Sequence, residues 1–282
     1  MGYLHDILSA ESGTEGASVV ENWPPPQSPW MAHAMLELAE IEYPGLDPKP
    51  YLTQLNEISS HLGDRLRNFN DGREFVEKAA AYLFGELGFR GNDTNFYDPD
   101  NSCLNQVLDR KLGIPITLSL VYVLVANRLK MPVYGVALPR RFVVRYDDGN
   151  YSTYIDPYGG GQRVSIGDCL RMAGLETADL SIFIPPTPKQ ILLRMLENLQ
   201  GCYLRRNDFE RSIQVLDWLL IGDPGKVQRY KLRGVIHLEL RHWGAARRDL
   251  ERYLHLSPED SPDKPEIRAQ LAEIHAQLGK IN

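Results

Sequence analysis

Apolar residues recur at helical spacing between residues 31 and 87. One series places its members on a single helical face: Leu52, Leu55, Ile58, Leu62 and Leu66. Pro44-Gly45 and Pro48 separate an earlier series from this one, and Asp71-Gly72 precedes a third series, Phe75–Leu87. This part of the chain is therefore predicted to form two or three helices.

Residues 88–112 are rich in turn formers, and they predict a long ordered loop. An apolar segment, Pro115–Leu129, follows this loop. Its length and its polar ending before Pro132 predict a buried helix, although alternating valines favour a strand. Pro115 fits such a helix because proline is tolerated in the first turn.

Short segments rich in β-branched and aromatic residues predict three strands: Val133–Ala137, Phe142–Tyr146 and Tyr151–Ile155. Asp148-Gly149, between the second and third, is typical of a two-residue type I′ hairpin turn. Such a turn would place Arg141 directly opposite Asp156, on one face of the sheet. Gly159–Gly161 is predicted to be a turn rather than a phosphate cradle, because no Lys-Ser/Thr pair accompanies it.

The last third of the chain repeats itself with a period of 34 residues. The shift superimposes the following pairs: Leu204 and Leu238, Phe209 and Trp243, Ser212 and Ala246, Leu216 and Leu250, Pro224 and Pro258. This period and pattern are typical of tetratricopeptide repeats. We predict two repeats and a closing helix, Pro265–Leu278, which must pack on the rest of the chain or on a partner, because about three repeats are needed for independent folding.

The composition supports a division into domains. The chain has 282 residues, of which 43% are hydrophobic and 24% charged, as in ordinary globular proteins. We expect an extended Pro/Ser-rich arm at 1–31, a core domain at 32–184 and the repeats at 189–282, joined at Pro185–Pro188. Residues 1–188 hold 15 basic and 24 acidic residues (net −9), whereas 189–282 hold 16 and 13 (net +3).

Several classes of protein are disfavoured. The longest uncharged stretch, Leu112–Asn127, has 16 residues, fewer than the ~20 that a membrane span needs. The first residues lack a secretory pattern, so we expect a cytoplasmic protein. A net charge of −6 disfavours nucleic-acid binding. No histidines or cysteines show zinc-ligand spacing, so we expect neither a metal nor another cofactor. We also expect the cysteine thiols to be reduced.

The core contains three motifs: Asp98-Pro99-x-x-Ser102, Gly113-Ile114-Pro115-Ile116-Thr117-Leu118-Ser119, and Ile155-Asp156-Pro157-Tyr158-Gly159-Gly160. Together they resemble a bacterial family that joins a transglutaminase-like core to tetratricopeptide repeats, and whose name refers to the regulation of invasion genes. The resemblance covers about residues 32–280. It implies an α+β fold, with helices packed on a small antiparallel sheet as in papain, followed by an all-α repeat region.

The same resemblance locates the positions of a catalytic triad. Active transglutaminases and papain-type enzymes place a cysteine at the head of the buried helix, a histidine on a strand and an aspartate on the neighbouring strand. In this chain Pro115 stands at the cysteine position and Arg141 at the histidine position, and only Asp156 is kept. Arginine is always protonated and cannot act as a general base. The pattern therefore predicts a pseudoenzyme, with Arg141 and Asp156 forming a structural ion pair.

Other polar residues accompany these three positions in a predicted vestigial site: Asn105, Pro115, Thr117, Ser119, Arg141 and Asp156. Asn105 is either an oxyanion donor or a residue that stabilises its loop. We expect Thr117 and Ser119 to bond backbone carbonyls or to face the core. The site is expected to bind a ligand without transforming it.

The favoured hypothesis is a regulatory protein that binds a protein or peptide and does not catalyse. The first helices of stacked repeats line a concave surface, which predicts a peptide groove at Arg194, Glu197, Lys231 and Leu238. The alternative is a hydrolase or acyltransferase that uses Cys103 with His33 or His61, because a triad is a constellation in space rather than in sequence. The oligomeric state is left open.

Overall fold

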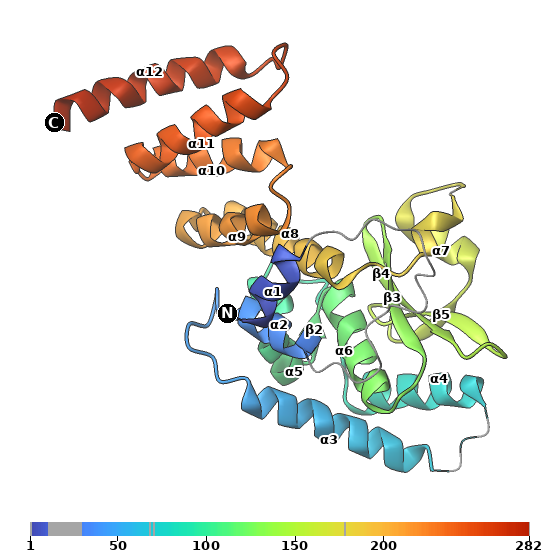
Figure 1. Ribbon diagram of the computed structural model, residues 1–282. Coiled ribbons are helices and arrows are strands. Elements are labelled where there is room, and N and C mark those ends of the chain that lie inside the picture. Colours follow the sequence, from blue (N-terminus) through green and yellow to red (C-terminus); the bar gives the residue numbers. More distant parts are fainter. Residues whose placement is uncertain (1, 11–29, 68, 70, 178, 282) are drawn as a thin grey trace. The chain divides into compact units, whose positions relative to one another are not determined.

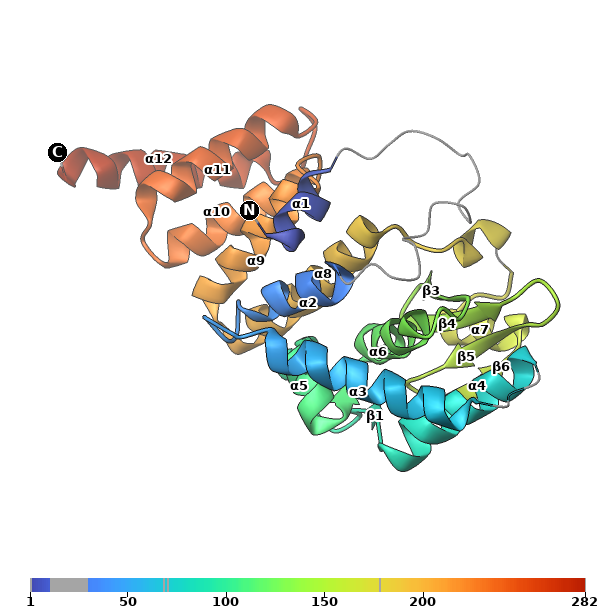
Figure 2. The same cartoon turned by 60° about the horizontal axis from the view of Figure 1, so that its bottom comes forward.

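The computed structural model describes residues 2–10, 30–67, 69, 71–177 and 179–281. The chain divides into two compact units. The first comprises residues 1–7 and 11–195, and the second comprises residues 8–10 and 196–282. Figures 1 and 2 show a mixed core of helices and strands and an array of helical hairpins. Among the described residues, no helix is both long and apolar enough to cross a membrane.

Helices make up most of the first unit. They are α1 (Tyr3–Ser9), α2 (Trp30–Ala39), α3 (Lys49–Arg65), α4 (Gly72–Ala80), α5 (Leu104–Arg110), α6 (Pro115–Arg128) and α7 (Ile166–Ala173). A π-helical turn, η1 (Ala81–Glu86), extends α4, and two short 3-10 turns are η2 (Pro99–Asn101) and η3 (Leu180–Phe183). The predicted series of helices between residues 31 and 87 and the buried helix from Pro115 are confirmed.

A four-stranded antiparallel sheet lies beside α6, with strand order β3-β4-β5-β6. Its strands are β3 (Val133–Leu138), β4 (Arg141–Asp147), β5 (Ser152–Asp156) and β6 (Gln162–Val164), and a separate parallel pair joins β1 (Arg90–Gly91) to β2 (Leu112–Gly113). Helix α6 packs on one face of the sheet, and α7 lies on the other face (Figure 2). The turn η3 packs on β3 at that second face. On the second face, Val143 and Tyr154 lie in a cluster with Cys169 and Phe183. The sheet is therefore buried on both faces.

Two expectations about the first unit were wrong. Residues 88–112 are not only a loop, because they contain α5, whose Leu104, Val107 and Leu108 recur at helical spacing and are buried. The predicted extended arm at 1–31 contains α1 and the start of α2. Its Pro-rich part lies outside the described residues.

The register of the β4–β5 hairpin differs from the predicted one by two residues. Asp147 pairs with Ser152 and Val144 with Ile155, so four residues rather than two form the loop. The Asp148 carboxylate accepts hydrogen bonds from the backbone N–H groups of Asn150 and Tyr151, at 2.8 and 2.7 Å, and this closes the longer loop. A shift of two keeps every side chain on its predicted face, because side chains alternate with a period of two.

The second unit consists of helical hairpins. Its helices are the part of α8 (Pro188–Arg206) after Met195, α9 (Phe209–Gly222), α10 (Val227–Glu239), α11 (Trp243–Leu256) and α12 (Lys264–Ile281). These are the two predicted repeats and the closing helix. Leu250, Tyr253 and Ile274 lie in its hydrophobic cluster. The division between the units falls within α8, after Met195, and not at the proline-rich segment that precedes the helix.

Gly234 permits the close approach of α10 and α11. A Cβ atom added at this position would lie 2.7 Å from Leu250 Cδ2 and 2.9 Å from Leu250 Cγ, and Leu250 is fully buried. We expect Gly234→Val to lower the free energy of unfolding by about 2 kcal/mol through overpacking, measured by urea denaturation. Gly201→Ala in α8 is the control and should raise it by about 0.5–1 kcal/mol, because alanine favours a helix interior. Equal effects of the two changes would contradict this interpretation.

Candidate functional site

Pro115, which the sequence resemblance equates with the catalytic cysteine, is the first residue of α6. The Thr117 hydroxyl accepts a hydrogen bond from the backbone N–H of Ile114 at 3.1 Å and donates to the Asn101 carbonyl at 2.7 Å. Thr117 therefore caps the head of the helix and ties it to the preceding loop. Proline offers no side-chain nucleophile at this helix end.

Arg141 and Asp156 form an ion pair on neighbouring strands. Arg141 Nη2 lies 2.6 Å from Asp156 Oδ2, and the side chains are 22% and 1% exposed. In the observed register the two residues are diagonal neighbours on the same face of the sheet. The predicted pair is thus present, although the residues are not directly opposed.

The Asp156 carboxylate is enclosed by the turn that follows β5. A Cβ atom added at Gly159 would lie 2.7 Å from Asp156 Oδ2, so glycine lets the backbone pass close to the carboxylate. Within the described part of the chain, Asp156 Oδ1 accepts no hydrogen bond. Arg141 therefore supplies the charge compensation for a carboxylate that water does not reach.

Tyr158 links this turn to the loop after β1. Its hydroxyl donates to Asp93 Oδ1 at 2.6 Å, and the Arg141 guanidinium lies 4.6 Å from the centre of its ring. Burial, followed by the bond to Asp93, raises the pKa of Tyr158 to about 12, so its hydroxyl stays protonated at neutral pH. A Cβ at Gly91 would come within 2.6 Å of the Tyr158 ring, which explains the glycine there.

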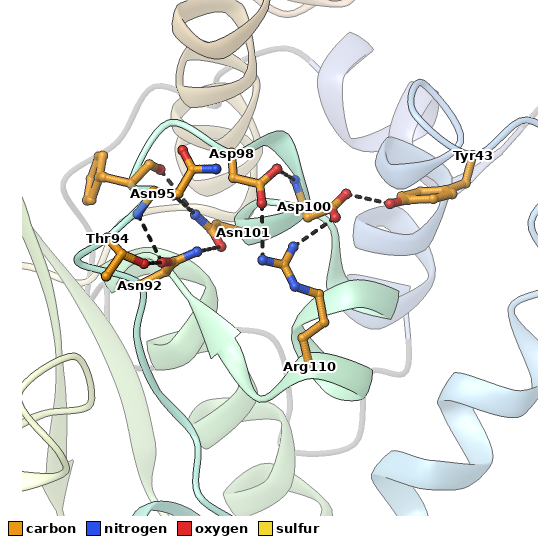
Figure 3. Close-up of polar contacts among 9 residues, drawn as sticks. Tyr43, Asn92, Thr94, Asn95, Asp98, Asp100, Asn101 and Arg110 are labelled. Carbon is orange, nitrogen blue, oxygen red and sulfur yellow. Dashed lines mark hydrogen bonds and ion pairs between the residues drawn. The ribbon is translucent and has the colours of Figure 1, made fainter.

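A buried amide network holds the loop in front of α6 (Figure 3). The Asn101 side chain is fully buried and donates to the carbonyls of Asn95 and Phe96, at 2.7 and 3.2 Å. Asn101 Oδ1 accepts from Asn92 Nδ2 at 3.0 Å, and Asn92 Oδ1 accepts from the Thr94 hydroxyl at 3.0 Å. The network folds the loop back on itself beneath the head of α6.

An ionic cluster continues the same loop (Figure 3). Arg110 of α5 binds Asp98 Oδ2 through Nη2 at 3.1 Å and Asp100 Oδ2 through Nη1 at 2.8 Å. The Tyr43 hydroxyl donates to the other oxygen of Asp100, and together with burial this bond raises the pKa of Tyr43. The Asp-Pro-x-x-Ser motif thus serves as a scaffold for α5 and α6.

Comparison with known proteins agrees with this arrangement of helix, sheet and hairpin array. The transglutaminase-like superfamily model matches residues 49–197, more than half of the chain, and a tetratricopeptide repeat model matches residues 199–278. The chain belongs to the transglutaminase-like superfamily. The α+β core followed by helical repeats, predicted from the sequence, is confirmed.

Curated relatives match most of the length of this chain. A UPF0162 protein of Xylella fastidiosa (strain 9a5c) is 34% identical over 238 residues, covering 82% of this chain and 84% of the relative. The UPF0162 protein PA3419 of Pseudomonas aeruginosa is 27% identical over 255 residues, covering 88% and 92%. F-box only protein 21 of Mus musculus is 27% identical over 262 residues, covering 86% of this chain and 41% of that protein. No solved structure matches the chain.

Within this transglutaminase-like core, the remaining residues of the predicted vestigial site have structural contacts. The Ser119 hydroxyl, fully buried in α6, donates to the Phe142 carbonyl of β4 at 3.0 Å. Asn105 is buried in α5 and hydrogen-bonds Tyr51 of α3. Asn105 Oδ1 accepts no hydrogen bond from the described residues. These contacts connect Ser119 and Asn105 to neighbouring elements.

The cysteine of the alternative enzyme hypothesis is inaccessible. Cys103 is 0% exposed and precedes the first turn of α5. His33 packs its ring 4.9 Å from the ring of Tyr3, and His61 lies on the exposed side of α3. Burial, and then Asp168, raises the pKa of the Cys169 thiol to about 11, so Cys169 is a neutral thiol at pH 7.

The four residues predicted to line a peptide groove are engaged within the chain. Arg194 belongs to the first unit, where its guanidinium donates to the Arg141 carbonyl at 2.9 Å and lies 5.6 Å from the centre of the Phe142 ring. In the second unit Glu197 pairs with Arg229 at 2.7 Å and Lys231 with Asp263 at 2.5 Å, and Leu238 packs on the hydrophobic cluster. The sequence pattern did not show these partners.

Tyr158, Asp93 and Asn101 were not selected from the sequence, although Tyr158 and Asn101 lie within the motifs that carried the family resemblance. Their hydrogen bonds join segments that are far apart in sequence, and spacing alone does not reveal them. No group of three or more His, Cys, Asp and Glu side chains suited to a metal ion occurs in the described parts of either unit.

Proposed function

We propose that this protein is a non-catalytic, regulatory interaction protein of the cytoplasm. Its transglutaminase-like core serves as a scaffold, and its tetratricopeptide repeats bind a protein or peptide. Two observations carry the proposal: Arg141 and Asp156 form an ion pair, and α6 begins with Pro115. The repeat region supports the second half, because stacked helix pairs offer extended binding surfaces.

The chemistry of acyl transfer needs two groups that these positions lack. A thiol or hydroxyl must attack the carbonyl carbon, and a base must remove its proton. Pro115 has no such group, and the guanidinium of Arg141 stays protonated at physiological pH. Asp156, which would orient a histidine in an active enzyme, instead compensates the charge of Arg141.

The partner would contact the first helices of the repeats, α8 and α10. Glu197 and Lys231 lie on these helices, and their ion-pair partners are Arg229 and Asp263. A bound peptide with charged groups would exchange these pairs for pairs of its own. Glu197 is 57% exposed and Lys231 is 32% exposed, so a peptide could reach both charges from solvent.

Restoring the two missing groups tests the assignment of the site. The wild-type chain should not hydrolyse p-nitrophenyl acetate above the rate of Cys103→Ser. We expect Pro115→Cys/Arg141→His to hydrolyse it about 100-fold faster than Pro115→Cys alone, because a positioned general base contributes at least that factor. Hydrolysis is followed by absorbance under single-turnover conditions.

The single variant Pro115→Cys is the matched control, because it supplies the thiol without the base. Equal rates of the single and double variants would show that Arg141 does not occupy the histidine position. Turnover by the wild-type chain that Cys103→Ser abolishes would instead support the alternative, a cysteine hydrolase or acyltransferase.

A further inference from the structure

Two histidines face each other in the turn between α10 and α11. His237 lies in the last turn of α10, and His242 is the N-cap of α11. Their Nδ1 atoms are 3.3 Å apart, with the ring centres 5.5 Å apart and the ring planes at 50°. The His242 backbone N–H donates to the His237 carbonyl at 2.8 Å, and Arg241 between them has φ 58°. The backbone therefore fixes the two imidazoles side by side.

The first repeat has the same turn with other side chains. Asp208 N–H donates to the Tyr203 carbonyl at 3.0 Å, and Asn207 has φ 54°. Asp208 caps α9 by accepting a hydrogen bond from the Arg211 N–H at 3.2 Å, whereas His242 makes no side-chain cap. At the position of Asn207, which tolerates positive φ, the second repeat has Arg241.

The second repeat thus lacks the favourable N-cap and the favourable left-handed residue of the first repeat, and it has a histidine at both facing positions. Helix stability does not explain this difference between the two repeats. The difference therefore indicates that the two imidazoles have another role. Neutral imidazole is the commonest metal ligand in proteins.

We propose that His237 and His242 chelate a zinc ion through their Nδ1 atoms. Zn–N bonds of about 2.0–2.1 Å meeting at a tetrahedral angle would place the two nitrogens about 3.3 Å apart. The observed separation is 3.3 Å. The turn therefore needs no change in the distance between the ligand atoms to accept the ion.

The electrostatics and the protons are compatible with this use. The His237 side chain is partly buried, and that of His242 is exposed. Asp217 and Asp249 face His237 as well, and both are paired with Arg233, at 2.6 and 2.7 Å. In the metal-free turn one Nδ1–H donates to the other Nδ1, so zinc binding moves that proton to Nε2 of the same ring.

The protein supplies two ligands only, since the described residues offer no third metal-ligating group in a cluster. Water completes the coordination, and the site is open rather than a closed structural centre.

Titration of the untagged, full-length chain with zinc chloride tests the proposal. Calorimetry should show one ion per chain at pH 7, and long-range ¹H–¹⁵N spectra should show shifts of both Nδ1 resonances. In His242→Asn the dissociation constant should rise at least about tenfold, because loss of even an outer-shell partner costs about that much. Asparagine is a good N-cap, so this variant is expected to fold at least as well as the wild type.

His255→Asn is the matched control, because His255 is exposed on the same helix, α11. It should bind zinc as the wild type does. The proposal would be overturned if zinc left both Nδ1 resonances unmoved, or if His242→Asn bound the ion as tightly as the wild type.

Discussion

Replacing Arg141 by alanine is expected to lower the free energy of unfolding by about 3 kcal/mol, because it leaves a buried carboxylate without its counter-charge. Asp156 is 1% exposed, and its second oxygen already accepts no hydrogen bond from the described residues. Urea denaturation at pH 7, followed by circular dichroism, measures the change.

Arg145→Ala is the matched control on the same strand and face. Arg145 pairs with Asp147 at 2.6 Å, but the two side chains are 29% and 30% exposed. Its removal should cost less than about 1 kcal/mol, as for other solvent-exposed pairs. The double change Arg141→Met/Asp156→Asn should recover part of the loss, because it removes the buried charge as well. Equal losses for Arg141→Ala and Arg145→Ala would show that burial of Asp156 is not the cause.

This result would bear on the proposed function. In an active triad the aspartate orients a histidine that changes its charge during each cycle. Under the proposed assignment, arginine takes the place of that histidine, and its guanidinium stays charged at physiological pH. The ion pair then serves to hold β4 and β5 together. A structural role of this kind suits a scaffold rather than an enzyme.

The hairpin between β4 and β5 shows what a hydrophobic pattern can determine. Alternation sets which residues share a face, so it predicted that Arg141 and Asp156 lie together. It does not set the length of the loop. That length depends on the Asp148 carboxylate, which accepts two backbone N–H groups, and Asp148-Gly149 has the sequence of a shorter turn.

The loop before α6 shows where the pattern fails. Asn92 and Asn101 are buried by hydrogen bonds to each other and to backbone carbonyls, and such bonds leave no periodic signal. The motif composition predicted turns, which is correct around η2, but it concealed α5, a helix of only seven residues. Short helices held by neighbouring elements are the hardest to predict, because packing rather than propensity stabilises them.

The residues predicted to line a groove have ion-pair partners that the sequence did not show, for a related reason. Lys231 and Asp263 are 32 residues apart, as are Glu197 and Arg229, so each pair joins successive helical hairpins. A charge that points out from a single helix looks available to a ligand. In stacked repeats, however, a residue of the neighbouring hairpin already pairs with that charge. The helices were predictable from the 34-residue period, whereas the use of their charges was not.

Asn101→Asp is expected to lower the free energy of unfolding by about 4 kcal/mol, although the two side chains have the same shape. The Asn101 amide donates to the carbonyls of Asn95 and Phe96, and its side chain is fully buried. A carboxylate has no N–H to donate, and it would bring a negative oxygen against two carbonyl oxygens. Because burial raises the pKa of a carboxyl group, the loss should be larger at pH 7 than at pH 5, where the folded state takes up a proton.

Asn95→Asp is the matched control, because it places the same charge in the same loop at an exposed position. It therefore shows whether the charge alone, without burial, lowers the stability. Asn95 is exposed, and it takes part in the network through its backbone N–H and carbonyl groups. Its replacement should change the stability by less than about 0.5 kcal/mol at either pH. If Asn101→Asp were equally mild, the loop would not depend on the buried amide, and Thr117, which binds the Asn101 carbonyl, would have to hold the head of α6 alone.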